Sequence, residues 1–236
     1  MITLYQFSTS PFTDKVRRVL AYKGLDYCVH EVVRSAVPAG DYAKASPTGK
    51  FPTIDHDGHI VWDSTDIVEY LDRTFPNRPL IPSEPKAAAM VHIVEDWADE
   101  SLYFYEMTMR LAWAHNLEAA LDEFAVIMPG IPREQRGPVI LENVGVLTRA
   151  QGIGRKPRDQ VVTDLARHFR SLDALLSAND WLACDSLSIA DLAVVAQVNA
   201  LLYAVEAREA LEATKHLKGW MARIDLLAPK SAGGLQ

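Results

Sequence analysis

The first 75 residues show the apolar patterns of strands and helices in turn. Residues 2–7 alternate apolar and polar side chains and are rich in β-formers, and residues 27–33 have the pattern of a second strand. Between them, Val16, Val19 and Leu20 recur at helical spacing after Pro11, and Gly24 marks the helix end. The order strand, helix, strand predicts an α/β domain.

A hairpin and a second helix extend this pattern. Asp57-Gly58 is typical of a tight hairpin turn, with a short apolar run before it and residues 60–62 as the returning strand. Ser64 is placed to cap the helix that follows. That helix has an apolar stripe at Ile67, Val68 and Leu71. The predicted order is therefore β-α-β, then a β-hairpin, then a helix.

The pattern changes after residue 75. Residues 75–85 contain four prolines, which neither a helix nor a central strand accommodates. Beyond them the patterns are almost all helical, over about 86–115, 117–127, 139–149, 159–178, 189–204 and 216–227, with a break at residues 128–138. We predict an α/β domain over residues 1–76, a proline-rich linker over 77–85 and an all-α domain over 86–236.

Composition narrows the function classes. The chain has 236 residues, of which 49% are apolar and 23% charged, as in an ordinary soluble globular protein. Its net charge of -7 argues against nucleic acid as a partner, because phosphate binding needs a basic face. No apolar run approaches the roughly 20 residues that cross a bilayer, so we expect no membrane partner. Two distant cysteines and no secretory signal indicate the cytoplasm.

The loop after the first strand carries the first candidate chemistry. Ser10-Pro11-Phe12-Thr13 lies between a strand pattern and a helix pattern. Cysteines at both ends would make it the dithiol of a glutaredoxin, but here both positions carry hydroxyl groups. This loop cannot form a disulfide, so any reacting sulfur belongs to another molecule.

Four segments together resemble the cytosolic glutathione S-transferase superfamily, over nearly the whole chain. They are "STSPFTDKVRRVLAYKG" at residues 8–24, "GKFPTI" at 49–54, "DSTDIVEYLD" at 63–72 and "LSIADLAVVAQV" at 187–198. They occur in the family's order and on both sides of a proline linker. The resemblance implies a thioredoxin-like domain followed by a helical bundle, glutathione as co-substrate without a metal, and a homodimer.

The same resemblance implies a set of glutathione-binding residues. The backbone of Phe51, before a cis Pro52, would pair with the cysteinyl part of the tripeptide as an added strand. The helix that opens at Ser64 would hold the γ-glutamyl carboxylate at its positive end, and Asp63 would face the ligand's ammonium group. Asp63 stands where the family more often has Glu or Gln. Asp99 lies where some family members reach across the dimer to the same ammonium group.

The catalytic group and the second substrate pocket complete the predicted site. We predict that Ser10 donates a hydrogen bond to the glutathione thiolate; Thr9, Ser8, Tyr5 and backbone N–H groups stay open as alternatives. Ser10 could instead only cap the helix that begins at Pro11. The pocket for a small electrophile is predicted to be lined by Phe12, Tyr103, Met107 and Arg110.

Three further patterns are interpreted as structural. Ser188 and Asp191 have the spacing of a helix capping box. His56 and His59 flank the hairpin turn without further metal ligands nearby, so we expect an exposed tip and no metal. Residues 151–157 lack the spacing of a phosphate loop and are expected to form an exposed connection between helices.

The sequence thus predicts a glutathione transferase that conjugates glutathione to small electrophilic substrates. A glutathione-dependent isomerase is the nearest alternative enzyme, although Pro11-Phe12 interrupts the "SSC" pattern of the zeta-type members. A noncatalytic glutathione-binding or scaffold protein on the same fold is a third reading, because a fold does not fix a function.

Overall fold

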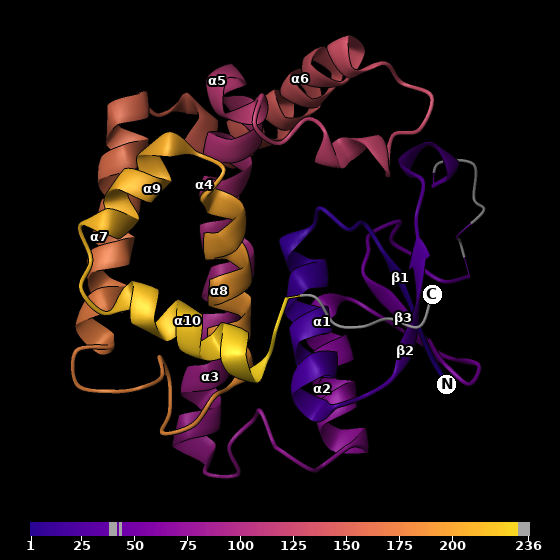
Figure 1. Cartoon of the computed structure of the whole chain (residues 1–236), viewed down its shortest axis with the longest axis vertical. Coiled ribbons are helices and arrows are strands. Elements are labelled where there is room, and N and C mark those ends of the chain that lie inside the picture. The colour runs from indigo at the N-terminus through magenta and orange to yellow at the C-terminus, as the bar shows by residue number, and fades with distance from the viewer. Residues whose placement is uncertain (38–41, 43, 231–236) are drawn as a thin grey trace.

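The computed structural model describes residues 1–37, 42 and 44–230 of the chain (Figure 1). An α/β unit at the N-terminus is followed by a helical region, which confirms the predicted fold class. The last six residues of the predicted all-α domain lie outside the described residues.

The N-terminal unit is built on a four-stranded mixed sheet in the order β2-β1-β3-β4. Strand β1 pairs in parallel with β2 and antiparallel with β3, which forms a hairpin with β4. Two helices, α1 and α2, lie between this sheet and the rest of the molecule (Figure 1). This is the predicted thioredoxin-like arrangement. The elements are β1 Ile2–Gln6, α1 Pro11–Lys23, β2 Tyr27–Glu31, the 3-10 turn η1 Arg34–Ala36, β3 Thr53–His56, β4 His59–Trp62 and α2 Ser64–Thr74.

Local sequence explains the boundaries of these elements. Every second residue of β1 is buried, as a strand with one face toward a core requires. Gly24 ends α1 in the left-handed conformation, at φ 65°. The expected N-cap of α2 was wrong by one residue. Asp63, rather than Ser64, occupies the cap, and its Oδ1 accepts a hydrogen bond from the Thr65 amide at 2.9 Å.

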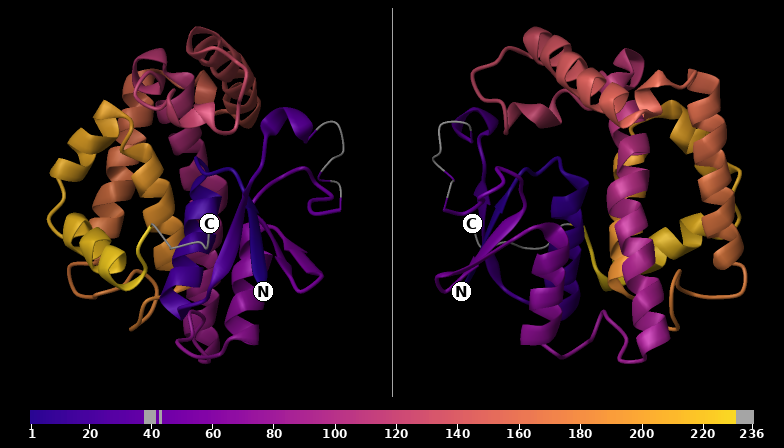
Figure 2. Two further views of the ribbon diagram at one scale, coloured as in Figure 1. Left: turned by 45° about the vertical axis from the view of Figure 1, so that its right-hand side comes forward. Right: turned by 180° about the vertical axis from the view of Figure 1, so that it is seen from behind.

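The helical region begins with one continuous helix from Pro85 to Ala112 (Figure 2). Two stretches of it are π-helical, and such stretches rotate the following side chains relative to a regular α-helix. They fall beside the cavity described below. The segments are α3 Pro85–Trp97, η2 Ala98–Leu102, α4 Tyr103–Glu106 and η3 Met107–Ala112.

Of the remaining helices, α8 (Ile189–Leu201) is almost entirely buried in the centre of the helical region, and the others pack around it and around the long helix. The other segments are α5 Ala114–Leu117, the 3-10 turn η4 Glu123–Ala125, α6 Arg133–Gln151, the 3-10 turn η5 Ile153–Arg155, α7 Arg158–Leu175, α9 Val205–Glu212 and α10 Leu217–Leu227. Helix α9 has no counterpart among the predicted elements.

Two predictions in this region were wrong. Residues 117–127 form a series of turns rather than an amphipathic helix, with i to i+3 hydrogen bonds such as Ala120 N to Leu117 O at 2.9 Å. Their apolar side chains pack into a second core cluster with α6, and this packing overrides helix propensity. The predicted break at 128–138 is shorter, because α6 starts at Arg133 and contains Pro138. Pro138 has no N–H, so α6 lacks one intrahelical hydrogen bond at this residue.

The two parts of the chain share one core. Helix α1 packs along α8, and a single cluster of buried residues includes Leu20 of α1, Leu71 of α2 and Leu192 of α8. The proline-rich segment belongs to the same core, since Leu80 is buried and its carbonyl accepts the Ile189 amide at 3.1 Å. The domain limits drawn from composition therefore stay a prediction.

Candidate functional site

One cavity of about 460 Å³ lies where the sheet, the start of α2 and the π-helical stretches meet. Its wall comes from the loop after β1, the loop before β3, and the residues around the start of α2 and along 96–111. The structure brings together here all of the residues proposed from the sequence: Ser10, Phe12, Phe51, Pro52, Asp63, Ser64, Tyr103, Met107 and Arg110.

The loop from Phe7 to Ser10 is a tight turn. The Ser10 amide donates to the Phe7 carbonyl at 3.0 Å, and the Ser8 amide donates to Glu31 Oε1 at 2.6 Å. Ser10 is the N-cap residue of α1, but its hydroxyl makes no capping hydrogen bond. The cap position is therefore occupied while the hydroxyl stays available to a ligand.

The alternative donors are placed differently. Thr9 lines the same cavity as Ser10, and both also line a second cavity of about 300 Å³ on the other side of the loop. Ser8 contributes to the second cavity. Tyr5 lies within β1 and packs against the ring of His30, with the ring centroids 5.0 Å apart. Ser10 and Thr9 are thus the two candidate hydroxyls at the larger cavity.

The loop before β3 presents unpaired backbone to the cavity. The Phe51–Pro52 peptide bond is cis. Within the described chain, no hydrogen bond joins the backbone of Phe51 to another residue. The Phe51 side chain is buried against Phe7, at 5.5 Å between ring centroids. An extended ligand could therefore add hydrogen bonds at Phe51.

The start of α2 faces the cavity with a positive helix end. Asp63 has φ 72°, a conformation unusual for a residue other than glycine. Ser64 is buried and follows as the first helical residue. Free N–H groups and the helix dipole make such an end favourable for a carboxylate. Strained backbone of this kind is often found at binding sites.

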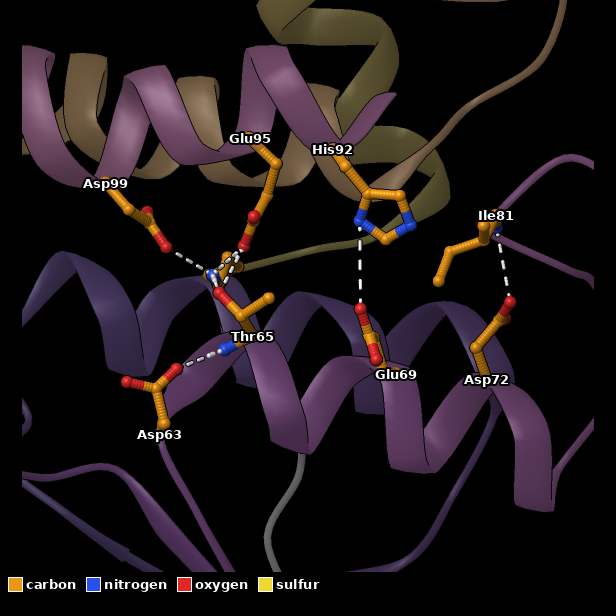
Figure 3. A network of polar contacts seen from close by, with 9 residues as sticks. Asp63, Thr65, Glu69, Asp72, Ile81, His92, Glu95 and Asp99 are labelled. Atoms are coloured by element: carbon orange, nitrogen blue, oxygen red, sulfur yellow. Dashed lines mark hydrogen bonds and ion pairs between the residues drawn. The ribbon is translucent and has the colours of Figure 1, made fainter. Parts of the chain in front are cut away.

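A buried ionic network connects the start of α2 to α1, α3 and η2 (Figure 3). Lys15 Nζ lies 2.6 Å from Glu95 Oε1 and 2.5 Å from Asp99 Oδ2. The Thr65 hydroxyl donates to Glu95 Oε1 at 2.7 Å, so α2 is joined to α3 one residue after Ser64. Asp99, which lies where some family members reach across the dimer, lines the cavity and contacts Lys15 of its own chain through Oδ2.

Burial and charge shift the pKa values in this network. Burial alone would lower the pKa of Lys15, but the Asp99 and Glu95 carboxylates raise it above its usual range. Burial raises the pKa of Asp99 to about 6, although Lys15 opposes the rise. For Glu95, Lys15 and the Thr65 hydroxyl outweigh burial and lower the pKa. The Asp99 carboxyl is therefore the member of this network that takes up a proton near pH 6.

The buried network was not among the features predicted from the sequence, although the sequence carries a signal for it. Lys15 lies next to the apolar stripe of α1, where a lysine is buried only when it is paired. Glu95 and Asp99 are four residues apart and share one face of a helix. A cation and two acids on apolar helix faces are thus the local signs of a buried ion pair.

The part of the cavity wall formed by Phe12, Tyr103 and Met107, here called the outer part, is aromatic and mostly buried. The rings of Phe12 and Tyr103 are 4.8 Å apart in an edge-on arrangement, and Met107 is buried beside them. Burial raises the pKa of Tyr103 far above its usual value, so its hydroxyl stays protonated. This part of the wall can bind an apolar group and donate a hydrogen bond.

Arg110 lies between the two cavities and contributes to both. Its side chain is 3% exposed, and its Nη1 donates to Glu106 Oε1 at 3.0 Å and to the Thr9 carbonyl at 3.2 Å. Its Nη2 donates to Glu123 Oε2 at 3.2 Å. Most of its donors are thus used within the protein.

The patterns interpreted as structural have clear surroundings. The Asp191 carboxylate accepts hydrogen bonds from the amide and the hydroxyl of Ser188, which confirms the capping box. The hairpin tip is exposed at Asp57, Gly58 and His59, as expected, whereas His56 is half-buried and its Nδ1 lies 2.8 Å from the Tyr70 hydroxyl. Residues 151–157 connect α6 to α7, and residues 155–157 are exposed as expected, whereas Ile153 is buried.

The described residues hold neither a cluster of metal-binding side chains nor a membrane-spanning helix. In the part of the chain that the structure describes, no three His, Cys, Asp or Glu side chains are grouped as metal ligands would be. Over the same residues, every helix is too short or too polar to span a bilayer.

The chain combines a thioredoxin-like sheet with a helical region, and residues of both line the larger cavity. Residues 4–79 match the family model for the N-terminal domain of glutathione S-transferases, and residues 126–225 match that for the C-terminal domain. The chain belongs to the cytosolic glutathione S-transferase superfamily.

Several relatives resemble the chain over most of its length. Maleylacetoacetate isomerase of Dictyostelium discoideum is 28% identical over 201 residues, which cover 83% of this chain and 77% of the relative. Protein LigF of a Sphingobium strain is 26% identical over 204 residues, covering 85% and 79%.

Solved structures share the fold. The β-etherase LigF structure aligns with a TM-score of 0.67 at 25% identity, over 95% of this chain and 94% of that one. The apo structure of glutathione S-transferase III aligns with a TM-score of 0.66 at 20% identity, over 95% and 91%, and shows the fold alone.

Proposed function

We propose that the protein is a glutathione S-transferase that binds glutathione in the larger cavity and transfers it to small electrophiles. The observation that carries this proposal is the convergence of three groups on one cavity. They are the unpaired backbone of Phe51, the helix end at Ser64 and the Ser10 hydroxyl, which makes no capping hydrogen bond. Their chemistry matches an extended peptide with a carboxylate and a thiol.

Each group has a distinct role in binding. Phe51 pairs with the cysteinyl backbone, and Ser64 with the N–H groups of α2 holds the γ-glutamyl carboxylate. Asp63 accepts from the ligand's ammonium group with the carboxylate oxygen that is not used by Thr65. The cysteinyl sulfur would then lie near Ser10, because Ser10, Phe51 and Ser64 line the same cavity.

The Ser10 hydroxyl activates the thiol by stabilising its anion. An ordinary thiol, with a pKa of about 8.5, is about 3% ionised at pH 7. A hydrogen bond donated to sulfur, together with the N–H groups at the start of α1, lowers that pKa. The anion also becomes a weaker nucleophile, with a Brønsted slope of about 0.4–0.5, so ionisation alone gives only a few-fold gain. Most of the acceleration comes from holding the electrophile beside the sulfur.

The electrophile occupies the outer part of the cavity. Phe12 and Met107 supply apolar surface, and the protonated hydroxyl of Tyr103 can donate to an oxygen that gains charge during the reaction. We propose a homodimer of cytoplasmic location, in line with the family and with the two free cysteines of the described chain. The exposed Met90 and Ile93 of α3 are available to such an interface.

A glutathione-dependent isomerase is the second candidate, because the isomerase from Dictyostelium matches most of the chain. In such a reaction the thiolate adds to a carbon–carbon double bond and leaves again after rotation. Glutathione is then not consumed. An assay of cis–trans isomerisation of maleylacetoacetate, with glutathione measured before and after, separates this activity from conjugation.

The test starts with retention on immobilised glutathione, followed by rate measurements with a panel of electrophiles. We expect retention and saturable conjugation by the wild type. Ser10→Ala should raise the pKa of the bound thiol, read from thiolate absorbance against pH, and weaken glutathione binding only at pH values where the wild type holds the thiolate. A shift in Thr9→Ala alone would assign the activating role to Thr9. Binding without turnover of any substrate in the panel would instead favour a scaffold protein.

A further inference from the structure

The loop that carries Ser10 is held by a side chain from the second half of the chain. Nη1 of Arg110 donates a hydrogen bond to the Thr9 carbonyl oxygen at 3.2 Å, across 101 residues of sequence. On its other side the loop is held by Glu31, which accepts the Ser8 amide. The loop is thus held between β2 and the π-helical stretch η3.

Arg110 is itself held by further groups around Nη1 and Nη2, while its Nε has no hydrogen-bond partner among the described residues. Glu106, one turn earlier, is 1% exposed and accepts from the same Nη1, while Glu123 accepts from Nη2. The ring of Tyr203 stacks on the guanidinium, at 4.5 Å from its central carbon, and the Tyr203 hydroxyl donates to Glu123. A planar, forked cation is needed to meet these partners at once.

We propose that Arg110 is a positioning residue that sets the thiol-activating geometry of the Ser10 loop through the Thr9 carbonyl. Arg110 keeps this carbonyl oxygen turned toward the guanidinium and away from the glutathione sulfur. The Ser10 hydroxyl and the N–H groups of α1 then face the thiolate. This inference rests on the proposed function, and it replaces direct contact with the electrophile as the main role of Arg110.

The physical reason is the sign of the dipole next to the sulfur. A carbonyl oxygen carries partial negative charge, so a Thr9 carbonyl released into the cavity would disfavour the thiolate. The peptide unit between Thr9 and Ser10 also fixes where the Ser10 side chain points. Small errors in such a geometry are costly for activity.

Two variants test the positioning role of Arg110, so that the test still stands if one of them does not fold. Arg110→Lys keeps a positive charge beside Glu106 but loses the fork. Arg110→Met combined with Glu106→Gln removes the cation without leaving a buried, uncompensated carboxylate. The matched control is Arg133→Lys, because Arg133 is 44% exposed and its partners Glu118 and Asp122 are exposed as well.

The first measurements are the titration of the bound thiol and the steady-state kinetics. In the double variant, we expect the pKa of the bound glutathione thiol to rise by about one unit, so that the thiolate fraction below that pKa falls about tenfold. The kcat at pH 6.5 should fall about five- to tenfold and recover above pH 9, while KM for glutathione changes less than about threefold. Arg110→Lys should shift the same quantities partway, and added methylguanidinium should restore part of the double variant's kcat.

A further measurement is amide hydrogen exchange of residues 7–12 in the protein without glutathione. Exchange should be faster in both Arg110 variants and unchanged in Arg133→Lys. A wild-type thiol titration and wild-type exchange in folded Arg110 variants would overturn the proposal. If the wild type itself binds no glutathione, the proposed function fails, whereas the exchange result still decides whether Arg110 positions the loop.

Discussion

Lys15 Nζ lies 2.6 Å from Glu95 Oε1, and the two side chains are 1% and 3% exposed. This contact joins the first helix of the thioredoxin-like unit to the long helix of the second half of the chain (Figure 3). Asp99 contacts the same ammonium group, so one buried cation meets two buried carboxyl groups. The pairing is more important for stability than the exposed ion pairs, because its members have no water to replace a lost partner.

Lys15→Met should therefore lower the free energy of unfolding by about 3–5 kcal/mol, since it leaves two buried carboxyl groups without their cation. Urea unfolding measures this change. Lys218→Met is the matched control, because Lys218 and its partner Glu212 are 48% and 70% exposed, and we expect a loss below about 1 kcal/mol. Equal losses in the two variants would contradict a structural role for the Lys15 network.

Asp99 predicts how stability depends on pH. Its pKa is raised from 3.8 to about 6 in the native protein, mainly by burial. The native state therefore takes up a proton as the pH falls from 6 to 4, before the unfolded chain does. The stability contributed by this proton rises as pH falls through that window and is lost as pH rises through 6, by at most about 1.4 kcal/mol per unit.

Urea titrations of wild type and Asp99→Asn at several pH values test this sign. Lys15 and Glu95 stay charged over the window, because the pKa of Lys15 is raised and that of Glu95 is lowered. The stability gap between wild type and variant should grow in favour of the wild type from pH 7 to pH 5. A gap that is constant with pH would show that Asp99 does not titrate there.

Asp191 should matter for folding and leave turnover intact. Its Oδ1 accepts from the Leu182 amide at 3.0 Å and from Trp220 Nε1 at 2.9 Å, in addition to the two bonds from Ser188. Asp191→Ala leaves these buried donors unpaired, so we expect a loss of about 3 kcal/mol or more. Thermal unfolding measures the loss, and kcat per folded molecule should be unchanged. A stable Asp191→Ala protein without activity would assign Asp191 to the chemistry.

Ser64→Ala should weaken glutathione binding without weakening the helix. A hydrogen bond to a carboxylate contributes about 1.5–3 kcal/mol, so the dissociation constant should rise about tenfold or more in calorimetry. Asp63 provides the cap of α2, and the melting temperature of Ser64→Ala should therefore stay close to that of the wild type. Asp63→Ala should lose about 1 kcal/mol of stability as well as affinity. Unchanged affinity in folded Ser64→Ala would remove Ser64 from the site.

Local patterns were sufficient for the elements whose cause is local. The alternation of β1, the proline at the start of α1, Gly24 at its end and the Asp57-Gly58 turn each act within a few residues. The capping box of Ser188 and Asp191 is likewise a contact within one helical turn. The fold class followed from the order of these elements.

Tertiary packing decided the rest. Residues 117–127 have a helical pattern, yet they coil into turns because their apolar side chains find partners on η3 and α6. The π-helical stretches depend on the same packing, and they set which side chains of 98–112 reach the cavity.

The sequence by itself determined the order of the elements and, through its resemblance to the glutathione S-transferases, led to the proposal that Ser64 and Ser10 bind a thiol peptide. Only the tertiary structure brought Lys15 to Glu95 and Arg110 to the Thr9 carbonyl, across 80 and 101 residues. In neither pair does the sequence around one residue indicate which distant residue it contacts. Such pairs are selected by the low dielectric and close packing of a core that exists only once both halves of the chain have folded together.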